Sequence, residues 1–342
     1  MNEPFSTSNK FKQEYLDGFD KVIAARRAEC DKMRADYVNP EKAAANREKY
    51  RADLVELLGW PLTEYETLKN TPMAVKRELR GEDNDSTAYS MQFEVLPELW
   101  FYGIYFETKH GDGECPFVIS QHGGSGSPEQ CSGFYGETTY HGMTERCLRR
   151  GANVFAPQLL MWCKGEAENH PKFDRFKIDV NLKHVGGSIQ ALEEFALRRV
   201  LDYFEAEGIA RLGHIGMVGL SYGGLYTFMT AALETRITAA YSSCYYNERY
   251  KYPSPDWTWK GGAMQFHDAE IVSLIAPRAL FLDAGRYDDA FTPDTFEREA
   301  ERAVEYFRAA GVEDKISYRV QPHYHCIAKE DDGFDFMFGY IG

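Results

Sequence analysis

A serine flanked by glycines ends a short apolar run in the sequence HIGMVGLSYGG, residues 214–224. Gly219, Ser221 and Gly223 form the pattern G-x-S-x-G. A serine at a sharp turn from a strand into a helix has a strained backbone, and small neighbours let the turn close with the hydroxyl exposed. The pattern predicts a nucleophilic serine, although a glycine-rich turn that binds phosphate, or that only reverses the chain, has the same composition.

Other groups that could take part in such chemistry follow three further apolar runs. They are His122, Gly123 and Gly124 after PFVISQ, Asp288 and Asp289 after RALFLDA, and His323 and His325 after ISYRVQ. A serine needs a base to take its proton, the base needs a carboxylate to orient it, and backbone N–H groups must stabilise the oxyanion. The chain offers these parts in the order oxyanion loop, serine, acid, histidine. The histidine pair also leaves a metal site open, because residues two apart in an extended segment face the same way.

The elements that must position these groups alternate after residue 115. Short apolar runs are separated by segments of helical pattern, near residues 138–149, 188–206 and 294–310 among others. This alternation predicts an α/β fold, a mostly parallel sheet with helices on both faces. Ligands bind such a sheet beyond the carboxyl ends of its strands, where all the groups above are placed.

The N-terminal part of the chain has a different pattern. Residues 1–61 are charged and helical in pattern, with a break at Asn39-Pro40 where proline suits the first turn of a second helix. In the first of these helices, apolar residues recur at spacings of three and four and form one stripe: Phe11, Tyr15, Phe19, Val22 and Ile23. We expect this helical extension to bury its stripe, either on its own subunit or, as we favour, against a second subunit of a homo-oligomer.

Residues 72–342 resemble the α/β-hydrolase superfamily, whose triad follows the order serine, acid, histidine. Residues 186–243, from GGSIQALEEF to ITAAYSS, look like the branch of acetyl xylan esterases and dienelactone hydrolases, with a long helix, the elbow strand and a helix in succession. The segment LIAPRALFLDAGRYDDAFTP is similar to the acid loop of that branch, and VQPHYHCI is similar to its final histidine loop.

The resemblance implies a role for each candidate. Asp288 is the acid, with Asp289 in reserve, and Phe291 is the aromatic residue that follows it. His325 is the base, and His323 is its neighbour and reserve. The resemblance implies no cofactor and no metal.

The oxyanion loop is less well defined. The family pattern assigns the backbone N–H groups of Tyr222, after the nucleophile, and of Gly124 to the oxyanion. Because HGGSGS lacks a third consecutive glycine, Gly123 stays in reserve. We expect His122 to be a buried, hydrogen-bonded residue.

Two insertions, near residues 158–187 and 244–262, should determine substrate specificity, because the core elements supply only the reaction. They carry the candidate substrate-binding aromatic residues Trp162, Tyr245, Tyr246, Trp257 and Trp259. Aromatic faces suit sugar rings or acyl groups, but the same side chains could instead pack over the sheet edge as a lid.

Composition excludes several classes of function. The net charge of −14 argues against nucleic acid or an anionic membrane as partner. Seven scattered cysteines without a C-x-x-C pair indicate reduced thiols and a cytoplasmic protein, and we expect neither a signal peptide nor a membrane span. The resemblance therefore implies a serine carboxyl-ester hydrolase that removes small acyl groups such as acetyl from carbohydrate-like or other small esters. A peptidase or amidase, a lyase and an acyl transferase stay open as alternatives.

Overall fold

The computed structural model describes residues 5–111, 113–161 and 171–342. Its strands are β1 (Val75–Glu82), β2 (Ser86–Leu96), β3 (Leu99–Thr108), β4 (Phe117–Gln121), β5 (Asn153–Pro157), β6 (Ile215–Leu220), β7 (Ala239–Ser243), β8 (Ala279–Gly285) and β9 (Ile316–Gln321). Its α-helices are α1 (Phe5–Tyr37), α2 (Pro40–Leu58), α3 (Tyr65–Leu68), α4 (Pro128–Cys131), α5 (Met143–Arg149), α6 (Arg175–His184), α7 (Ile189–Ala206), α8 (Tyr222–Leu233), α9 (Asp268–Ser273), α10 (Pro293–Ala309) and α11 (Asp332–Ile341). Short 3-10 turns are η1 (Leu62–Glu64), η2 (Pro255–Trp257), η3 (Gly262–Met264) and η4 (Glu313–Lys315). Among the described residues, none of these helices is long and apolar enough to span a bilayer.

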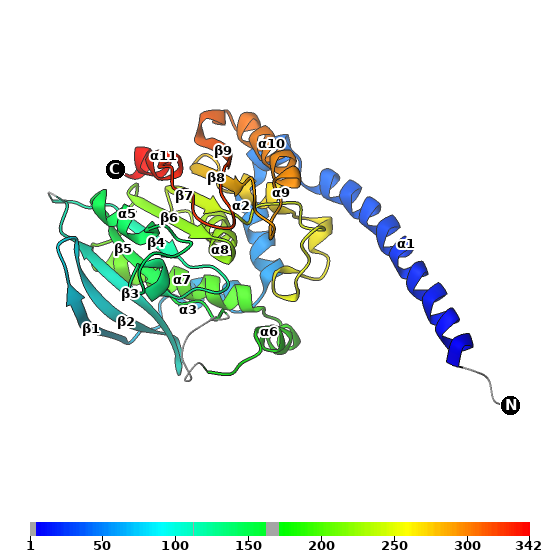
Figure 1. Cartoon of the computed structure of the whole chain (residues 1–342), viewed down its shortest axis with the longest axis horizontal. Coiled ribbons are helices and arrows are strands. Elements are labelled where there is room, and N and C mark those ends of the chain that lie inside the picture. The colour runs from blue at the N-terminus through cyan, green and yellow to red at the C-terminus, as the bar shows by residue number, and fades with distance from the viewer. Residues whose placement is uncertain (1–4, 112, 162–170) are drawn as a thin grey trace.

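The nine strands form one sheet in the order β1-β2-β3-β5-β4-β6-β7-β8-β9. The first three strands pair antiparallel, and β3 also pairs antiparallel with β5. From β5 to β9 every pairing is parallel, which confirms the predicted mostly parallel sheet (Figure 1). The strand order reverses between β4 and β6. The connections that follow these two strands therefore run in opposite directions along the sheet.

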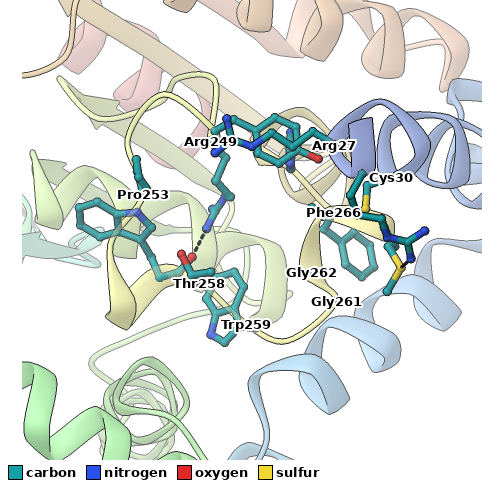
Figure 2. Close-up of a pocket in the computed structure, with 15 residues that line it drawn as sticks. Arg27, Cys30, Arg249, Pro253, Thr258, Trp259, Gly261, Gly262 and Phe266 are labelled. Carbon is teal, nitrogen blue, oxygen red and sulfur yellow. Dashed lines mark hydrogen bonds between the residues drawn. The ribbon is translucent and has the colours of Figure 1, made fainter. Parts of the chain in front are cut away.

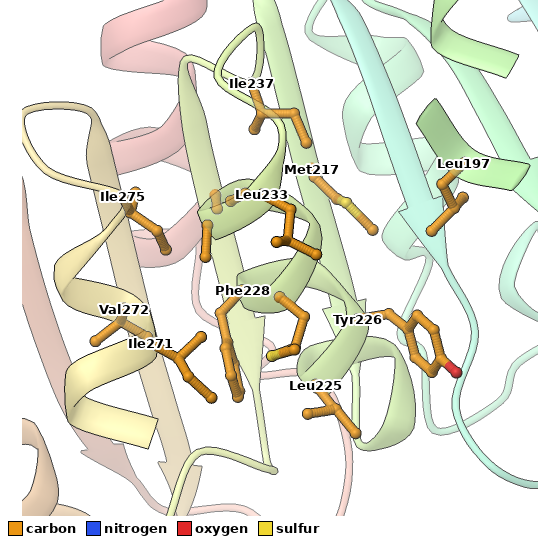
Figure 3. Close-up of a cluster of buried hydrophobic side chains, with 14 of the residues drawn as sticks. Leu197, Met217, Leu225, Tyr226, Phe228, Leu233, Ile237, Ile271, Val272 and Ile275 are labelled. Atoms are coloured by element: carbon orange, nitrogen blue, oxygen red, sulfur yellow. The ribbon is translucent and has the colours of Figure 1, made fainter. Parts of the chain in front are cut away.

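Helices cover both faces of the sheet because its strands are apolar on both sides. Phe117 and Ile119 of β4 belong to the core under α7, α8, α9 and α10, whereas Val118 points into the core under α5 and α11. Helix α8 is the centre of the first core, where Phe228 packs among the aliphatic side chains of Ile271 and its neighbours (Figure 3). The side chain of Phe228 is fully buried.

Helix α5 begins later than the pattern over residues 138–149 predicts. His141 and Gly142 have φ values of 43° and 66°, which a right-handed helix does not accept. The segment before Met143 is therefore a pair of turns, closed by hydrogen bonds from the His141 amide to the Thr138 carbonyl and from the Met143 amide to the Tyr140 carbonyl.

The two N-terminal helices pack very differently. Helix α2 begins at Pro40, where Asn39 Oδ1 accepts the Lys42 amide, and it buries Leu54 completely against the body. Helix α1 contacts η3 near its C-terminal end, where Arg34 donates to the Ala263 carbonyl at 2.7 Å. The N-terminal half of α1 extends away from the body (Figure 1), and its apolar stripe is exposed. The stripe is therefore not buried on its own subunit.

Candidate active site

The register of the sheet brings the candidate groups to one edge. Gln121 at the end of β4 pairs with Gly219, Leu220 at the end of β6 pairs with Ser243, and Gly285 at the end of β8 pairs with Gln321. The segments that follow β4, β6, β8 and β9 therefore leave the sheet at the same edge. This is the edge at which α/β sheets bind ligands.

Ser221 occupies the turn between β6 and α8 with φ 60° and ψ −122°. Its amide donates to the Ser243 carbonyl at 2.8 Å, which fixes this left-handed residue against the end of β7. A Cβ atom on Gly223 would lie 2.2 Å from the Gln121 carbonyl oxygen, and one on Gly219 would lie 2.3 Å from the Gly223 carbonyl oxygen. Both glycines of the G-x-S-x-G pattern are thus required by close backbone contacts. The turn holds a strained serine at the start of a helix.

Asp288 and His325 form a hydrogen-bonded pair. His325 Nδ1 lies 2.8 Å from Asp288 Oδ2, and the other carboxylate oxygen accepts the amides of Ala290 and Phe291 at 2.8 and 3.0 Å. Burial alone would raise the pKa of Asp288, but the bond from His325 and the two amides outweigh burial and lower that pKa. Asp288 is 4% exposed, whereas Asp289 is on the surface. An ionised Asp288 holds Nδ1–H of His325 and leaves Nε2 available.

We expect Asp288→Asn to lower kcat/KM for an ester about 10⁴-fold, because an amide at this position favours the wrong tautomer of the histidine. The matched variant Asp289→Asn should stay within twofold of the wild type. Steady-state hydrolysis of phenyl acetate by the two purified variants decides between the carboxylates. A larger loss with Asp289→Asn would assign the acid to Asp289.

Cys244 links the serine turn to the Asp288–His325 pair. It follows Ser243, whose carbonyl binds the Ser221 amide, and its backbone has φ 54°. Its Sγ lies within 4.8 Å of a ring nitrogen of His325 and of an Asp288 carboxylate oxygen. Burial raises the pKa of this thiol to about 12, so Cys244 is neutral and does not compete with the serine as a nucleophile.

His323 is bound to a different carboxylate. Its Nε2 lies 3.4 Å from Asp283 Oδ2, a buried oxygen that also accepts the Tyr241 hydroxyl at 3.1 Å. Burial alone would lower the pKa of His323, but its bonds with Asp283 and with the thiols of Cys244 and Cys326 outweigh burial and raise that pKa. The raised pKa favours the imidazolium form of His323 beside Asp283, and the other ring nitrogen, Nδ1, lies 2.7 Å from the Tyr324 carbonyl oxygen.

Two sets of described side chains come close enough to hold a metal ion: Cys244 with Asp288 and His325, and Cys244 with Asp283 and His323. The two histidines therefore fall into separate sets, whereas the sequence allowed them to form one pair. Each histidine already has a carboxylate partner.

The HGG loop lies beside Ser221. A Cβ atom on Gly123 would lie 3.2 Å from that of Ser221, so the loop passes directly over the serine turn. The Gly123 amide donates to the Tyr140 hydroxyl at 2.7 Å, which occupies the reserve oxyanion donor and leaves Gly124 as the candidate in this loop. Tyr222, the other candidate donor, follows Ser221 directly and is the first residue of α8.

His122 shapes this loop. It is fully buried, its Nε2 accepts the Leu159 amide at 3.0 Å, and its Nδ1–H donates to the Gly123 carbonyl at 2.8 Å. Burial lowers the pKa of His122 to about 4. A neutral imidazole with both nitrogens bound is a structural support for the loop.

Aromatic rings connect the base to the residue after the serine. Phe291 stacks on His325 with ring centroids 5.9 Å apart, and Tyr245 lies 5.0 Å from Phe291. Trp257 lies 5.3 Å from Tyr245 and 5.0 Å from Tyr222. Of the predicted aromatic residues, Tyr245 and Trp257 thus lie next to residues of the candidate site.

The remaining predicted aromatic residues do not line this space. Tyr246 is 1% exposed and donates its hydroxyl to the Glu299 carbonyl, so the expectation that it contacts substrate is corrected: it is a core residue. Trp259 lines a cavity beside α1 that the triad candidates do not line. Trp162 lies outside the described residues.

The sequence did not reveal the buried charge network behind Tyr222. Arg175, 1% exposed, binds Asp256 at 2.7 Å and Glu193 at 3.0 Å, and the Tyr222 hydroxyl donates to Asp256 at 3.1 Å. The network joins α6, α7 and the 244–262 insertion to the residue that follows Ser221. The one available signal was the presence of opposite charges, Arg175 and Asp256, in the two insertions.

Comparisons with known proteins agree on the fold. No protein-family model matches the sequence. The Bacillus subtilis (strain 168) protein named "Putative hydrolase YtaP" is 23% identical over 228 residues, which are 63% of this chain and 74% of that protein. A "putative acetyl xylan esterase" from Bacteroides fragilis NCTC 9343 has a TM-score of 0.67 at 14% identity, covering 88% of this chain and 82% of that chain. A glucuronoyl esterase from Solibacter usitatus has a TM-score of 0.63 at 12% identity, covering 86% and 92%.

The strand order and these likenesses identify an α/β-hydrolase fold, as the sequence predicted.

Proposed function

We propose that the protein is a serine carboxyl-ester hydrolase that removes small acyl groups, acetyl first, from carbohydrate esters. The observation that carries the proposal is the meeting, at one sheet edge, of a strained Ser221 and the hydrogen-bonded pair Asp288–His325. The names of the similar structures, an acetyl xylan esterase and a glucuronoyl esterase, support an ester of a carbohydrate as substrate.

In the proposed reaction Ser221 Oγ attacks the ester carbonyl carbon while His325 Nε2 takes the hydroxyl proton. Asp288 stabilises the imidazolium, and the amides of Tyr222 and Gly124 bind the oxyanion. The C–O bond to the alcohol then breaks, and the alcohol leaves with the proton from His325. Water, activated by the same histidine, hydrolyses the acyl-serine and releases the acid.

Small acyl groups are favoured because large side chains fill the space around the base. Phe291 stacks on His325, and Tyr245 and Trp257, 4% and 7% exposed, close the side away from the solvent. A long acyl chain would have to displace these packed rings.

The test combines a fluorophosphonate probe with a panel of substrates. We expect one adduct per chain, located on Ser221 by peptide mass analysis. We also expect kcat/KM to fall at least tenfold from p-nitrophenyl acetate to the octanoate, and p-nitroacetanilide to react far more slowly than the acetate. Faster cleavage of the anilide would favour the amidase alternative, and an adduct on another residue would refute the proposal.

We further propose that two copies pair through the exposed half of α1. Its large apolar side chains are 45–88% exposed: Phe5, Phe11, Tyr15, Leu16, Phe19, Val22 and Ile23. A stripe of this size marks an interaction surface. An antiparallel pairing centred on Tyr15 would place Phe11 opposite Phe19 of the second copy, and Lys10 opposite its Asp20. These two pairs are self-complementary, as a two-fold contact requires.

Substitution on this stripe should therefore change the mass in solution. Phe19→Glu should halve the mass measured by light scattering, because a carboxylate cannot be buried unpaired between two helices. Leu79→Glu is the matched control: Leu79 is 67% exposed on β1, remote from α1, and its substitution should leave the mass unchanged. A wild-type protein with the mass of one chain would refute the pairing.

A further inference from the structure

A cavity of about 450 Å³ lies between α1 and the 244–262 insertion (Figure 2). Arg27 and Cys30 of α1 form one side of it, and Arg249 and Trp259 from the insertion form the other. Its volume is in the range of ligand sites and is sufficient for one or two sugar rings. The residues proposed for catalysis do not line it.

The charged side chains that line this cavity are all arginines, although the protein carries a net charge of −14. Arg249 is held by Asp268 and donates to the Trp257 carbonyl at 2.8 Å, and Arg26 is paired with Glu29. Arg27 lies over the Tyr250 ring, 4.7 Å from its centroid, and is the cation with the fewest other contacts among the lining residues described.

Further arginines lie near the cavity, beyond those that line it. His267, another lining residue, is buried, and burial together with the nearby arginines, Arg34 and Arg249 first, lowers its pKa to about 2. The arginines thus add to burial in keeping His267 neutral, and the lining residues described include no carboxylate that would repel an anion.

The walls are aromatic as well as cationic. Trp257, Trp259, Tyr250 and Phe266 contribute flat faces, and the indole Nε1 of Trp259 is buried without an acceptor among the described residues. Trp259 is only 7% exposed. Flat apolar faces and a cation together fit a sugar ring that carries a carboxylate.

We propose that this cavity binds a uronate ring of the same carbohydrate that carries the ester. The inference rests on the proposed function and adds that the substrate is an acidic carbohydrate. Trp257 connects the two places, because its ring contacts Tyr222 and Tyr245 beside the candidate triad and it also lines the cavity. One substrate could therefore occupy both sides of Trp257.

The first test measures binding of D-glucuronate and D-glucose to the full chain by calorimetry, since the two sugars differ in the carboxylate. We expect glucuronate to bind at least tenfold more tightly than glucose, and Arg27→Gln to remove this difference. Lys32→Gln, an exposed cation on the same helix outside the cavity, is the control and should keep it. Equal binding of the two sugars, or no effect of Arg27→Gln, would overturn the inference.

The second test compares acetylated xylo-oligosaccharides with and without a glucuronate branch. Arg27→Gln should raise KM for the branched substrate about tenfold and leave KM for the neutral one unchanged. Binding of glucuronate without any preference for the branched substrate would overturn the inference, because the sugar would then be a separate ligand. Since calorimetry needs no turnover, glucuronate binding by a protein that cleaves no ester would refute the proposed function alone.

Discussion

Ser221→Ala should lower kcat/KM for p-nitrophenyl acetate about 10⁶-fold, to the slow rate that the oxyanion site and substrate binding alone support. The loss follows from the proposed mechanism, since Ser221 carries the hydroxyl at the end of β6 and the His325–Asp288 pair lies in the loops that follow β8 and β9 at the same edge of the sheet. Alanine keeps the Cβ atom and the backbone amide that donates to the Ser243 carbonyl, so the turn should be preserved.

Two controls make this result specific. The thermal midpoint of Ser221→Ala should match the wild type within a few degrees, and the fluorophosphonate adduct should disappear. Cys244→Ala tests the nearest alternative nucleophile, the neutral thiol beside the pair. A phosphonate adduct retained in Ser221→Ala would show that the nucleophile is another residue.

The sequence was sufficient for the features that depend on short-range constraints. Gly219 is needed because a Cβ atom there would meet the carbonyl oxygen of Gly223, only four residues away. A constraint of this kind leaves a local pattern. The alternation of strands and helices likewise predicted the parallel sheet, and the parallel register then carries Ser221 and Gly285 to the same edge.

Features that depend on long-range packing left no such pattern. Tyr140 reaches the Gly123 amide from a turn seventeen residues later, and Arg175 meets Asp256 across eighty-one residues. Neither contact has a spacing that could be read from the sequence. Tyr245 and Tyr246 are adjacent residues of the same type. Only the path of the chain after β7 places Tyr245 beside the site and Tyr246 in the core.

The histidine pair shows the same limit. His323 and His325 are equivalent by spacing, and each has a carboxylate partner in the structure: Asp283 at 3.4 Å for His323 and Asp288 at 2.8 Å for His325. They differ in exposure, since the side chain of His325 is 29% exposed and that of His323 is 8% exposed. A base must reach the substrate, so exposure favours His325.

The two histidines should therefore respond to substitution in opposite ways. His325→Gln should lower kcat/KM about 10⁵-fold and leave the thermal midpoint nearly unchanged, because it removes an accessible base. His323→Gln should keep most of the kcat/KM but lower the free energy of unfolding by about 3 kcal/mol, because the buried Asp283 loses the cation that neutralises it. Hydrolysis of p-nitrophenyl acetate and thermal unfolding, measured on the same samples, give both quantities.

This double comparison separates a base from a structural cation more sharply than activity alone. If His323→Gln lost the activity and kept its stability, the base would be His323. Asp283 would then be the carboxylate that orients this base. A chelator provides the remaining control. With EDTA present, the wild-type rate should not change, because each histidine is paired with a carboxylate. Loss of activity with EDTA would instead assign a metal ion to one of the two sets that share Cys244, and the roles of both histidines would then follow from that ion.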